Sequence, residues 1–124
     1  MAVRGIRGAI SVDKNNRQEI IMETQHLLQE IVKKNNINHE DVCSIFFSVT
    51  TDLTSEFPAI AARKLGFSHT PLLCLTEIPV QGSLARVVRI LVHWNTDIPQ
   101  KDMVHVYLKD ATSLRPDLSE NSKK

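Results

Sequence analysis

The segment between residues 14 and 36 carries the clearest hydrophobic pattern in the chain. Apolar residues recur there at helical spacing and charged residues lie between them, as expected of a helix with one buried side. The apolar positions are Ile20, Ile21, Leu27, Leu28, Ile31 and Val32. Asn15 or Asn16 can cap the start of this helix, and the lysines and asparagines at 33–36 suit its end. The pattern predicts one long amphipathic helix.

Five other stretches are rich in β-branched and aromatic residues, which favour strands. They span residues 3–12, 41–50, 70–78, 84–97 and 103–108. The apolar spacing at 84–97 also fits a helix, but its density of valine and isoleucine favours a strand. Residues 51–67 predict a loop and a short helix that stops at Gly66. The alternation of strands and helices predicts an α/β (α+β) domain, with a sheet of about five strands packed on the long helix.

The composition suits one domain, which we place at residues 1–118, with residues 119–124 as a disordered tail. The 15 basic and 14 acidic residues give a formal net charge of +1, whereas nucleic-acid-binding domains are usually clearly basic. No apolar run approaches the roughly 20 residues of a membrane span, and the first residues lack the apolar core of a signal peptide. Cys43 and Cys74 lie in apolar stretches, as buried thiols do in a reducing compartment. These features predict a cytoplasmic protein with no nucleic-acid or membrane partner.

A few polar residues interrupt the predicted strands or stand near them, and these are the candidates for function. Each has an ordinary explanation, because a lone arginine or glutamate on a strand is usually exposed and a lone tyrosine is usually packed. Arg7 and Arg89, however, have small or apolar neighbours that predict partial burial, and a buried guanidinium needs an acceptor. One glutamate cannot neutralise all the arginines, so the set favours a pocket for a small dianion. The candidates are Arg7, Arg63, Glu77, Arg89, Tyr107 and Arg115.

Other kinds of chemistry have little support in the sequence. The histidines lack the spacing of metal ligands, Cys74 has no activating base beside it, and no motif of paired catalytic carboxylates is present. A phosphate site is disfavoured because no glycine-rich loop is followed by a lysine. If the chain is an enzyme, we expect it to hold and polarise its substrate rather than to transfer protons.

Six short segments resemble the monofunctional chorismate mutases of the AroH class, in the order and at about the spacing of that family. They are VRGIRGAI at 3–10, FPAIAAR at 57–63, CLTE at 74–77, RVVRILVHWNTD at 86–97, HVYL at 105–108 and LRPDL at 114–118. The resemblance covers nearly the whole chain, from residue 3 to residue 118. It implies a mixed sheet with one long helix, and a homotrimer whose sheets form a barrel-like core with an active site in each cleft between subunits.

The resemblance also implies a reaction. Enzymes of this family are isomerases that rearrange chorismate to prephenate, a pericyclic, Claisen-type step of the shikimate route to phenylalanine and tyrosine. The reaction needs no cofactor, metal or covalent intermediate. The lack of an acid–base motif in the sequence agrees with such a mechanism, in which electrostatic stabilisation of the transition state lowers the barrier.

The family's site can be carried over residue by residue. Arg89 resembles the cation that binds the ether oxygen of chorismate, where negative charge builds in the transition state. Arg7 and Tyr107 resemble the ligands of the enolpyruvyl carboxylate. Glu77 resembles the partner of the ring hydroxyl, and it can balance the positive charge that builds on the ring.

The glycines near Arg7 need a reason of their own. Glycine weakens a strand and usually marks a close approach of backbone or ligand. In the light of the resemblance, we expect Gly5 and Gly8 to leave space beside Arg7 for a substrate that lies against the strand.

The rest of the expected site also follows from the resemblance. Leu73 and Cys74 would line the pocket wall next to Glu77. A neighbouring subunit would supply the rim, where two arginines attract the ring carboxylate, and its residues are Phe57, Ala59, Arg63, Leu114 and Arg115. Two positions depart from the family member compared, because Ile60 replaces a lysine and Leu73 replaces a threonine. The first change removes a cation from the rim.

Two other functions fit a trimer with arginine-lined clefts between subunits. One is a small enzyme similar to the reactive-intermediate deaminases, which would not predict the pairing of Glu77 with Arg89 or the LRPDL segment. The other is a regulator that binds a small anion and signals to a partner without catalysis.

Overall fold

The computed structural model describes residues 1–114, so Arg115 and the expected tail at 119–124 lie outside the described residues. The described part contains one five-stranded sheet with the order β3-β2-β4-β1-β5. Its strands are β1 (Ala2–Ser11), β2 (Val42–Val49), β3 (Leu72–Thr76), β4 (Val87–Thr96) and β5 (Val106–Leu108). The helices are α1 (Arg17–Asn35) and α2 (Ala59–Lys64), with short 3₁₀ segments η1 (His39–Asp41), η2 (Gln100–Asp102) and η3 (Lys109–Leu114).

The long helix begins and ends as its sequence predicts. The side chain of Asn16 accepts a hydrogen bond from the backbone N–H of Glu19, which satisfies one of the free donors of the first turn. At the other end Asn36 adopts a left-handed conformation, with φ of 55°, and its N–H bonds back to the last turn. Local sequence therefore fixes both ends of α1.

The element types predicted for the described residues are confirmed, with changes in length. The stretch expected at 84–97 contains a strand rather than a helix, β4, which covers Val87–Thr96, and α2 ends just before Gly66, whose φ is 97°. The strand expected at 103–108 is shorter, because only residues 106–108 pair with β1. Side chains from the preceding segment contact the rest of that edge of β1.

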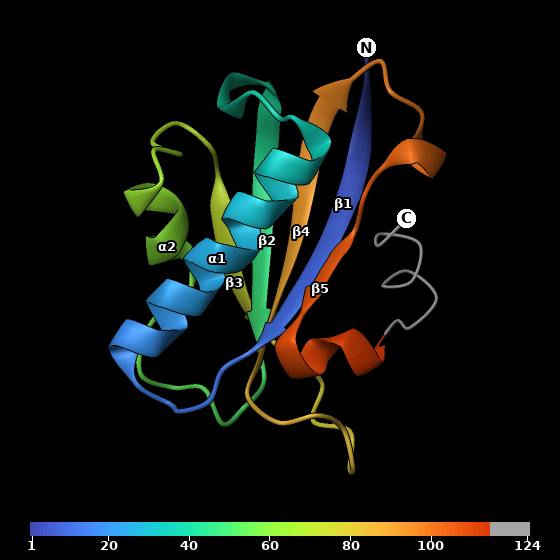
Figure 1. The fold of residues 1–124 in the computed structure, drawn as a ribbon. Coiled ribbons are helices and arrows are strands. Elements are labelled where there is room, and N and C mark those ends of the chain that lie inside the picture. Colours follow the sequence, from blue (N-terminus) through green and yellow to red (C-terminus); the bar gives the residue numbers. More distant parts are fainter. Residues whose placement is uncertain (115–124) are drawn as a thin grey trace.

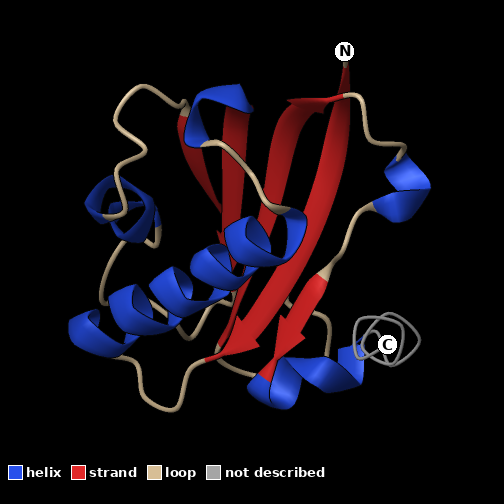
Figure 2. Cartoon of the chain, turned by 45° about the horizontal axis from the view of Figure 1, so that its top comes forward, coloured by secondary structure: helices blue, strands red, loops and turns tan. Residues whose placement is uncertain are grey.

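Both helices lie on one face of the sheet (Figures 1 and 2). β4 runs antiparallel to β1 and β2, whereas β5 is parallel to β1 and β3 is parallel to β2. The connections β1–α1–β2 and β2–α2–β3 therefore join parallel strands and step across the sheet in the same direction. Since such crossovers are almost always right-handed, both helices must cover the same face. Neither α1 nor α2 lies on the opposite face, although the 3₁₀ segment η3 packs there against Ala9 through Ala111.

Strand register divides the side chains between a core face and an open face. Ile6 stands opposite Val92 and Ile10 opposite Val88, and all four residues are buried in the core beneath α1. The neighbouring positions of β1 and β4 face the other way, with Arg7 opposite Leu91 and Ala9 opposite Arg89. Arg7 and Arg89 therefore lie on the open face, which α1 and α2 do not cover.

The structure gives Gly8 a different role from the expected one. A Cβ atom added at Gly8 would lie 2.8 Å from Cδ1 of Ile31, 3.0 Å from Cδ1 of Leu27 and 2.9 Å from the backbone oxygen of Val106. Gly8 therefore allows α1 and β5 to approach β1 closely, on the core face. The expectation that it leaves space for a substrate is wrong, whereas Gly5 does face the open side, beside Leu91.

Candidate active site

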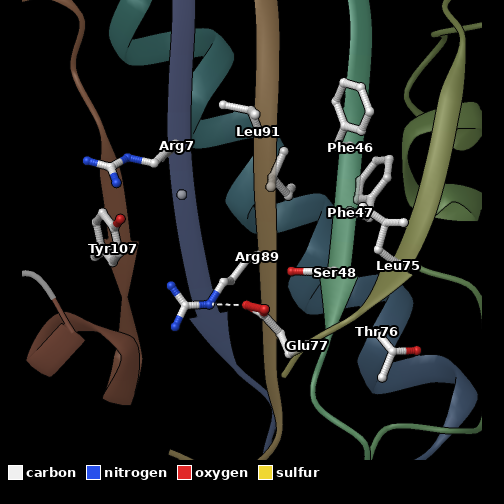
Figure 3. Close-up of a pocket in the computed structure, with 12 residues that line it drawn as sticks. Arg7, Phe46, Phe47, Ser48, Leu75, Thr76, Glu77, Arg89, Leu91 and Tyr107 are labelled. Atoms are coloured by element: carbon white, nitrogen blue, oxygen red, sulfur yellow. Dashed lines mark ion pairs between the residues drawn. The ribbon is translucent and has the colours of Figure 1, made fainter. Parts of the chain in front are cut away.

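A pocket of 340 Å³ lies on the open face of the sheet, between β5 and β3. Its volume is at the lower end of the range for small-molecule sites, roughly 300–1,000 Å³. The pocket brings together Arg7 from β1, Arg89 from β4, Tyr107 from β5 and Glu77 from just after β3 (Figure 3). These four residues are the ones that the sequence predicted as the centre of the site.

An ion pair fixes the position of Arg89. Nε of Arg89 lies 2.5 Å from Oε1 of Glu77, with 44% and 27% of the two side chains exposed. The backbone N–H of Glu77 still pairs with the carbonyl of Val49, so the carboxylate is held as an extension of β3. The terminal nitrogens of Arg89 point away from Glu77 (Figure 3), and residues 1–114 make no hydrogen bond to them. The guanidinium is therefore anchored by one edge and open to a ligand by the other.

Tyr107 and Arg7 differ in how they are held. Tyr107 is only 7% exposed, and it packs in a small apolar cluster with Ala9, Val87 and Ala111. Arg7 extends its side chain toward Tyr107 across the open face (Figure 3), and it is exposed. Arg89, with 44% of its side chain exposed, is thus partly covered as expected, whereas Arg7 is exposed in a single chain.

The described lining of the pocket carries two guanidinium groups and one carboxylate. The excess positive charge, with a phenol and planar donor forks, suits an organic anion with carboxylates. Among residues 1–114, no group of three or more histidine, cysteine, aspartate or glutamate side chains is arranged to hold a metal ion. The geometry favours the binding and orientation of an anion.

A second group of predicted residues lies elsewhere in the chain. Ala59 and Arg63 belong to α2, Phe57 precedes it and is 68% exposed, and Cys74 lies beside Ala59 and Arg63. None of these residues lines the 340 Å³ pocket. Two strands separate β3 from β1, a distance of roughly 14 Å at the usual strand spacing. One chain alone thus keeps the two groups apart.

Leu73 and Cys74 do not share a pocket wall within one chain, contrary to expectation. Cys74 stands opposite Phe47, on the core face, whereas Leu73 stands opposite Phe46, on the open face, and it is half exposed. Burial raises the pKa of the Cys74 thiol, against smaller opposing effects of the Ala59 N–H and the Arg63 charge. A thiol in this state is a poor nucleophile at neutral pH.

A larger hollow of 680 Å³ shares Glu77 and Arg89 with the first pocket. Leu114, which was expected at the rim from a neighbouring subunit, lies on the border of this hollow in the same chain. Arg115 follows directly but falls outside the described residues. The Glu77–Arg89 ion pair is therefore common to both hollows.

The sequence analysis missed two polar residues of the pocket, Ser48 and Thr76. Ser48 stands directly opposite Arg89 in the β2–β4 register. Its position in the alternating strand β2 was a signal, because Ser48 and Phe46 share a face that Phe47 does not. Strand order, which the sequence did not supply, was needed to bring that face next to Arg89.

The open sheet face thus presents two arginines, one carboxylate and one packed phenol in a single pocket. This set of groups is typical of a binding site for a small organic anion. The part of the chain that the structure describes contains no helix that is both long and apolar enough to cross a membrane.

Comparison with known proteins is consistent with this class of site. The sequence profile of the family described as chorismate mutase type I matches residues 3–118. Chorismate mutase AroH of Thermus thermophilus is 50% identical over 117 residues, which cover 94% of this chain and 96% of the relative. Chorismate mutase AroH of Bacillus subtilis (strain 168) is 42% identical over 120 residues, which cover 96% of this chain and 94% of that protein.

A solved structure, chorismate mutase from Clostridium thermocellum, superposes with a TM-score of 0.87 at 49% identity and covers 88% of this chain and 97% of its own. The chain belongs to the type I chorismate mutase family, and it is an isomerase of aromatic amino acid biosynthesis. The family, fold class and enzyme class expected from the sequence are confirmed. The deaminase-like and regulatory alternatives have no support in these comparisons.

Proposed function

We propose that the chain rearranges chorismate to prephenate in the pocket of Arg7, Glu77, Arg89 and Tyr107, by electrostatic stabilisation of the transition state. One observation carries the proposal. Glu77 anchors one edge of the Arg89 guanidinium, and the opposite edge points away from Glu77 on the same face as Arg7 and Tyr107. The arrangement supplies fixed donors before any substrate arrives, which is the condition for electrostatic preorganisation.

The rearrangement takes place within one molecule. The ether C–O bond of chorismate breaks, a C–C bond forms between the enolpyruvyl group and the ring, and no proton or electron is exchanged with the protein. Because the C–O bond breaks ahead of C–C bond formation, the ether oxygen gains negative charge in the transition state. A guanidinium aimed at that oxygen binds the transition state more tightly than the substrate and so increases kcat.

Arg7 and Tyr107 bind the enolpyruvyl carboxylate in this proposal. A guanidinium fork matches a carboxylate in two parallel hydrogen bonds, and the phenol adds a third donor. The Tyr107 ring loses little freedom on binding, because its cluster already holds it. These contacts are made to a carboxylate whose charge hardly changes during the reaction, so they serve mainly to bind and orient.

Glu77 has two roles in the proposal. It accepts a hydrogen bond from the ring hydroxyl, and it balances the positive charge that builds on the ring as the C–O bond breaks. The ion pair with Arg89 adds a third effect, since it holds the guanidinium in the catalytic orientation when the pocket is empty.

The complete site forms between subunits of a homotrimer in this proposal. Three of the residues expected to form the rim, Phe57, Ala59 and Arg63, lie in α2 or just before it, too far across the sheet to close the pocket of the same chain. The open face also exposes Leu73 and Leu75 to about half of their area, 50% and 49%, and exposed apolar faces are typical of association surfaces. A neighbouring chain would bring Phe57, Ala59 and Arg63 to the pocket.

Arg63 and Arg115 attract the ring carboxylate near solvent in this arrangement. Ile60 stands where the compared family member has a lysine, so the rim of this chain carries one cation fewer. The free thiols of Cys43 and Cys74 suit a reducing compartment, and we place the protein in the cytoplasm. The proposed chemistry requires no cofactor.

The direct test follows the ultraviolet absorbance of chorismate with purified protein and identifies the product as prephenate. We expect rapid loss of absorbance with the wild-type chain and almost none with Arg89→Ala. A chain that binds chorismate and leaves it unchanged would overturn the proposal in favour of a binding function.

A further inference from the structure

The outer edge of β1 is completed by side chains as well as by a strand. β5 pairs with β1 only from Gly8 to Ile10. Before Gly8, the backbone of β1 faces the segment that leads from β4 to β5. Gln100 and His105 of this segment bond to β1 in the places where a longer β5 would have done so.

Gln100 brackets Gly5 with its amide. Oε1 of Gln100 accepts from the N–H of Gly5 at 2.8 Å, and Nε2 donates to the carbonyl of Gly5 at 2.6 Å. Two residues further on, Nδ1 of His105 accepts from the backbone N–H of Arg7 at 2.9 Å. The side chain of His105 therefore holds the backbone of Arg7, whose guanidinium is proposed to bind the carboxylate.

The donor in this bond fixes the state of the imidazole. A backbone N–H can only donate, so Nδ1 of His105 carries no proton and the neutral ring has its proton on Nε2. An asparagine presents its Oδ1 acceptor at the same branch of the side chain as Nδ1, whereas leucine fills similar space with no acceptor. His105→Asn and His105→Leu therefore form a matched pair, because the first keeps an acceptor for the Arg7 N–H and the second removes it.

His105 is itself presented by a fixed segment. The side chain of Asn35, at the end of α1, accepts from the N–H of Val104 at 2.8 Å and donates to the carbonyls of Val104 and Ile31 at 2.9 Å. Asn35 is 9% exposed, so water competes little for these bonds. The contacts run from α1 through Val104 to His105, and Tyr107 lies two residues beyond.

The geometry points to His105 as a positioning residue for Arg7, supported by Gln100. His105 does not touch the substrate. It fixes the backbone of Arg7 so that the guanidinium and the Tyr107 hydroxyl keep the separation that suits one carboxylate. This inference rests on the proposed function of the pocket, and it adds a residue that acts through Arg7.

Steady-state kinetics of two variants test the inference. We expect His105→Leu to raise KM for chorismate about tenfold, the usual effect of one lost hydrogen bond of this kind, with a much smaller change in kcat. His105→Asn keeps the acceptor and should restore most of the loss. His26→Leu, on the exposed side of α1, is the matched control and should leave KM unchanged.

A purely structural role would give another result. If His105→Leu and His105→Asn raised KM equally while circular dichroism showed both folded, the acceptor at Nδ1 would be irrelevant and the inference overturned. A wild-type KM in His105→Leu would overturn it as well.

A measurement on the wild-type chain covers the case in which a variant does not fold. The N–H···N bond should give a nitrogen–nitrogen scalar coupling between the Arg7 amide and His105 Nδ1 in labelled protein, and its absence would contradict the inference. This coupling is independent of turnover. If the wild-type chain failed to convert chorismate but showed the coupling, the proposed function would fail, whereas the hydrogen bond from the Arg7 backbone to His105 would still be established.

Discussion

Arg89 carries a permanent charge and, among the described residues of the pocket, it alone has a free donor edge beside an edge anchored by an ion pair. We predict that Arg89→Ala lowers kcat/KM by at least ~10³, mainly through kcat, because one preorganised electrostatic contact is typically worth about 3–4 kcal/mol in the transition state. Steady-state kinetics measure the loss, and circular dichroism checks that the variant remains folded.

Two further variants separate the charge of Arg89 from its shape. Arg89→Lys keeps the charge but loses the fork, so it should recover only part of the rate. A neutral isostere of arginine keeps the donors and deletes the charge. A near-native rate with that isostere would contradict the charge-stabilisation mechanism, and Lys34→Ala, on the surface of α1, controls for the change in net charge.

The buried thiol at Cys74 leads to a prediction about pH. Burial raises its pKa, so the thiolate fraction near neutrality is lower in the folded chain than in the unfolded one.

No proton moves in the proposed reaction, and arginine stays charged up to pH ~12. We therefore expect kcat to be nearly constant from about pH 6 to 9, without the bell shape of acid–base catalysis.

The pH–rate profile checks this expectation, and a steep limb inside that range would refute it. Alkylation followed by mass spectrometry tests the thiol separately. Iodoacetamide should modify Cys74 more slowly in the folded chain than in denaturant, and equal rates would show that burial does not protect it.

At the scale of elements, the contact between α1 and the sheet depends on Gly8. We predict that Gly8→Ala destabilises the fold by roughly 1–3 kcal/mol or more, the usual cost of overpacking, because one of the crowded atoms is the backbone oxygen of Val106. Gly5→Ala is the matched control, since its added Cβ would meet only Leu91, at an ordinary 3.6 Å. Urea unfolding followed by circular dichroism compares the two, and equal stabilities would show that α1 can shift to make room.

Elements whose signals are local were predictable from the sequence. The apolar stripe and capping asparagines of α1 lie within a single segment, and the valines and isoleucines of β4 identified it as a strand. The order of strands was not predictable, because β4 lies between β1 and β2 only through contacts between distant segments. The length of β5 was missed for a related reason, since side chains of Gln100 and His105 replace its first residues.

In the candidate site too, some features could be predicted from the local sequence and others depended on how the strands pair. Arg7, Glu77, Arg89 and Tyr107 stood out as polar residues in apolar strands, and the structure gathers them in one pocket. The positions of Leu73 and Cys74 were not predictable, because the face that each occupies depends on the register of β3 against β2. A shift of one residue would exchange their faces, and the sequence does not state that register.

For the whole molecule, we predict a homotrimer. Light scattering at micromolar concentration should give a mass about three times the 14.0 kDa of one chain. A mass near that of one chain, with full activity, would place the complete site within a single chain.

Mixed assemblies test the shared site more sharply. A chain with Arg89→Ala has a defective pocket, and one with Arg63→Glu has a defective rim. When equal amounts are refolded together, about a quarter of the sites should combine an intact pocket with an intact rim, if chains assort at random. Activity well above that of either variant alone is the expected outcome. A mixture no more active than its parts would refute a site shared between chains.

The placement of the chain's single tryptophan and single tyrosine has a practical consequence. Trp94 lies in the core with 5% exposure, roughly 17 Å along β4 from Arg89 and on the opposite face of the sheet. Tyr107 borders the pocket. Indole emission therefore reports the loss of the core, while the ring-proton resonances of the one phenol report what occupies the pocket. Folding and ligand occupancy can be followed on the same unlabelled sample by two signals that do not interfere.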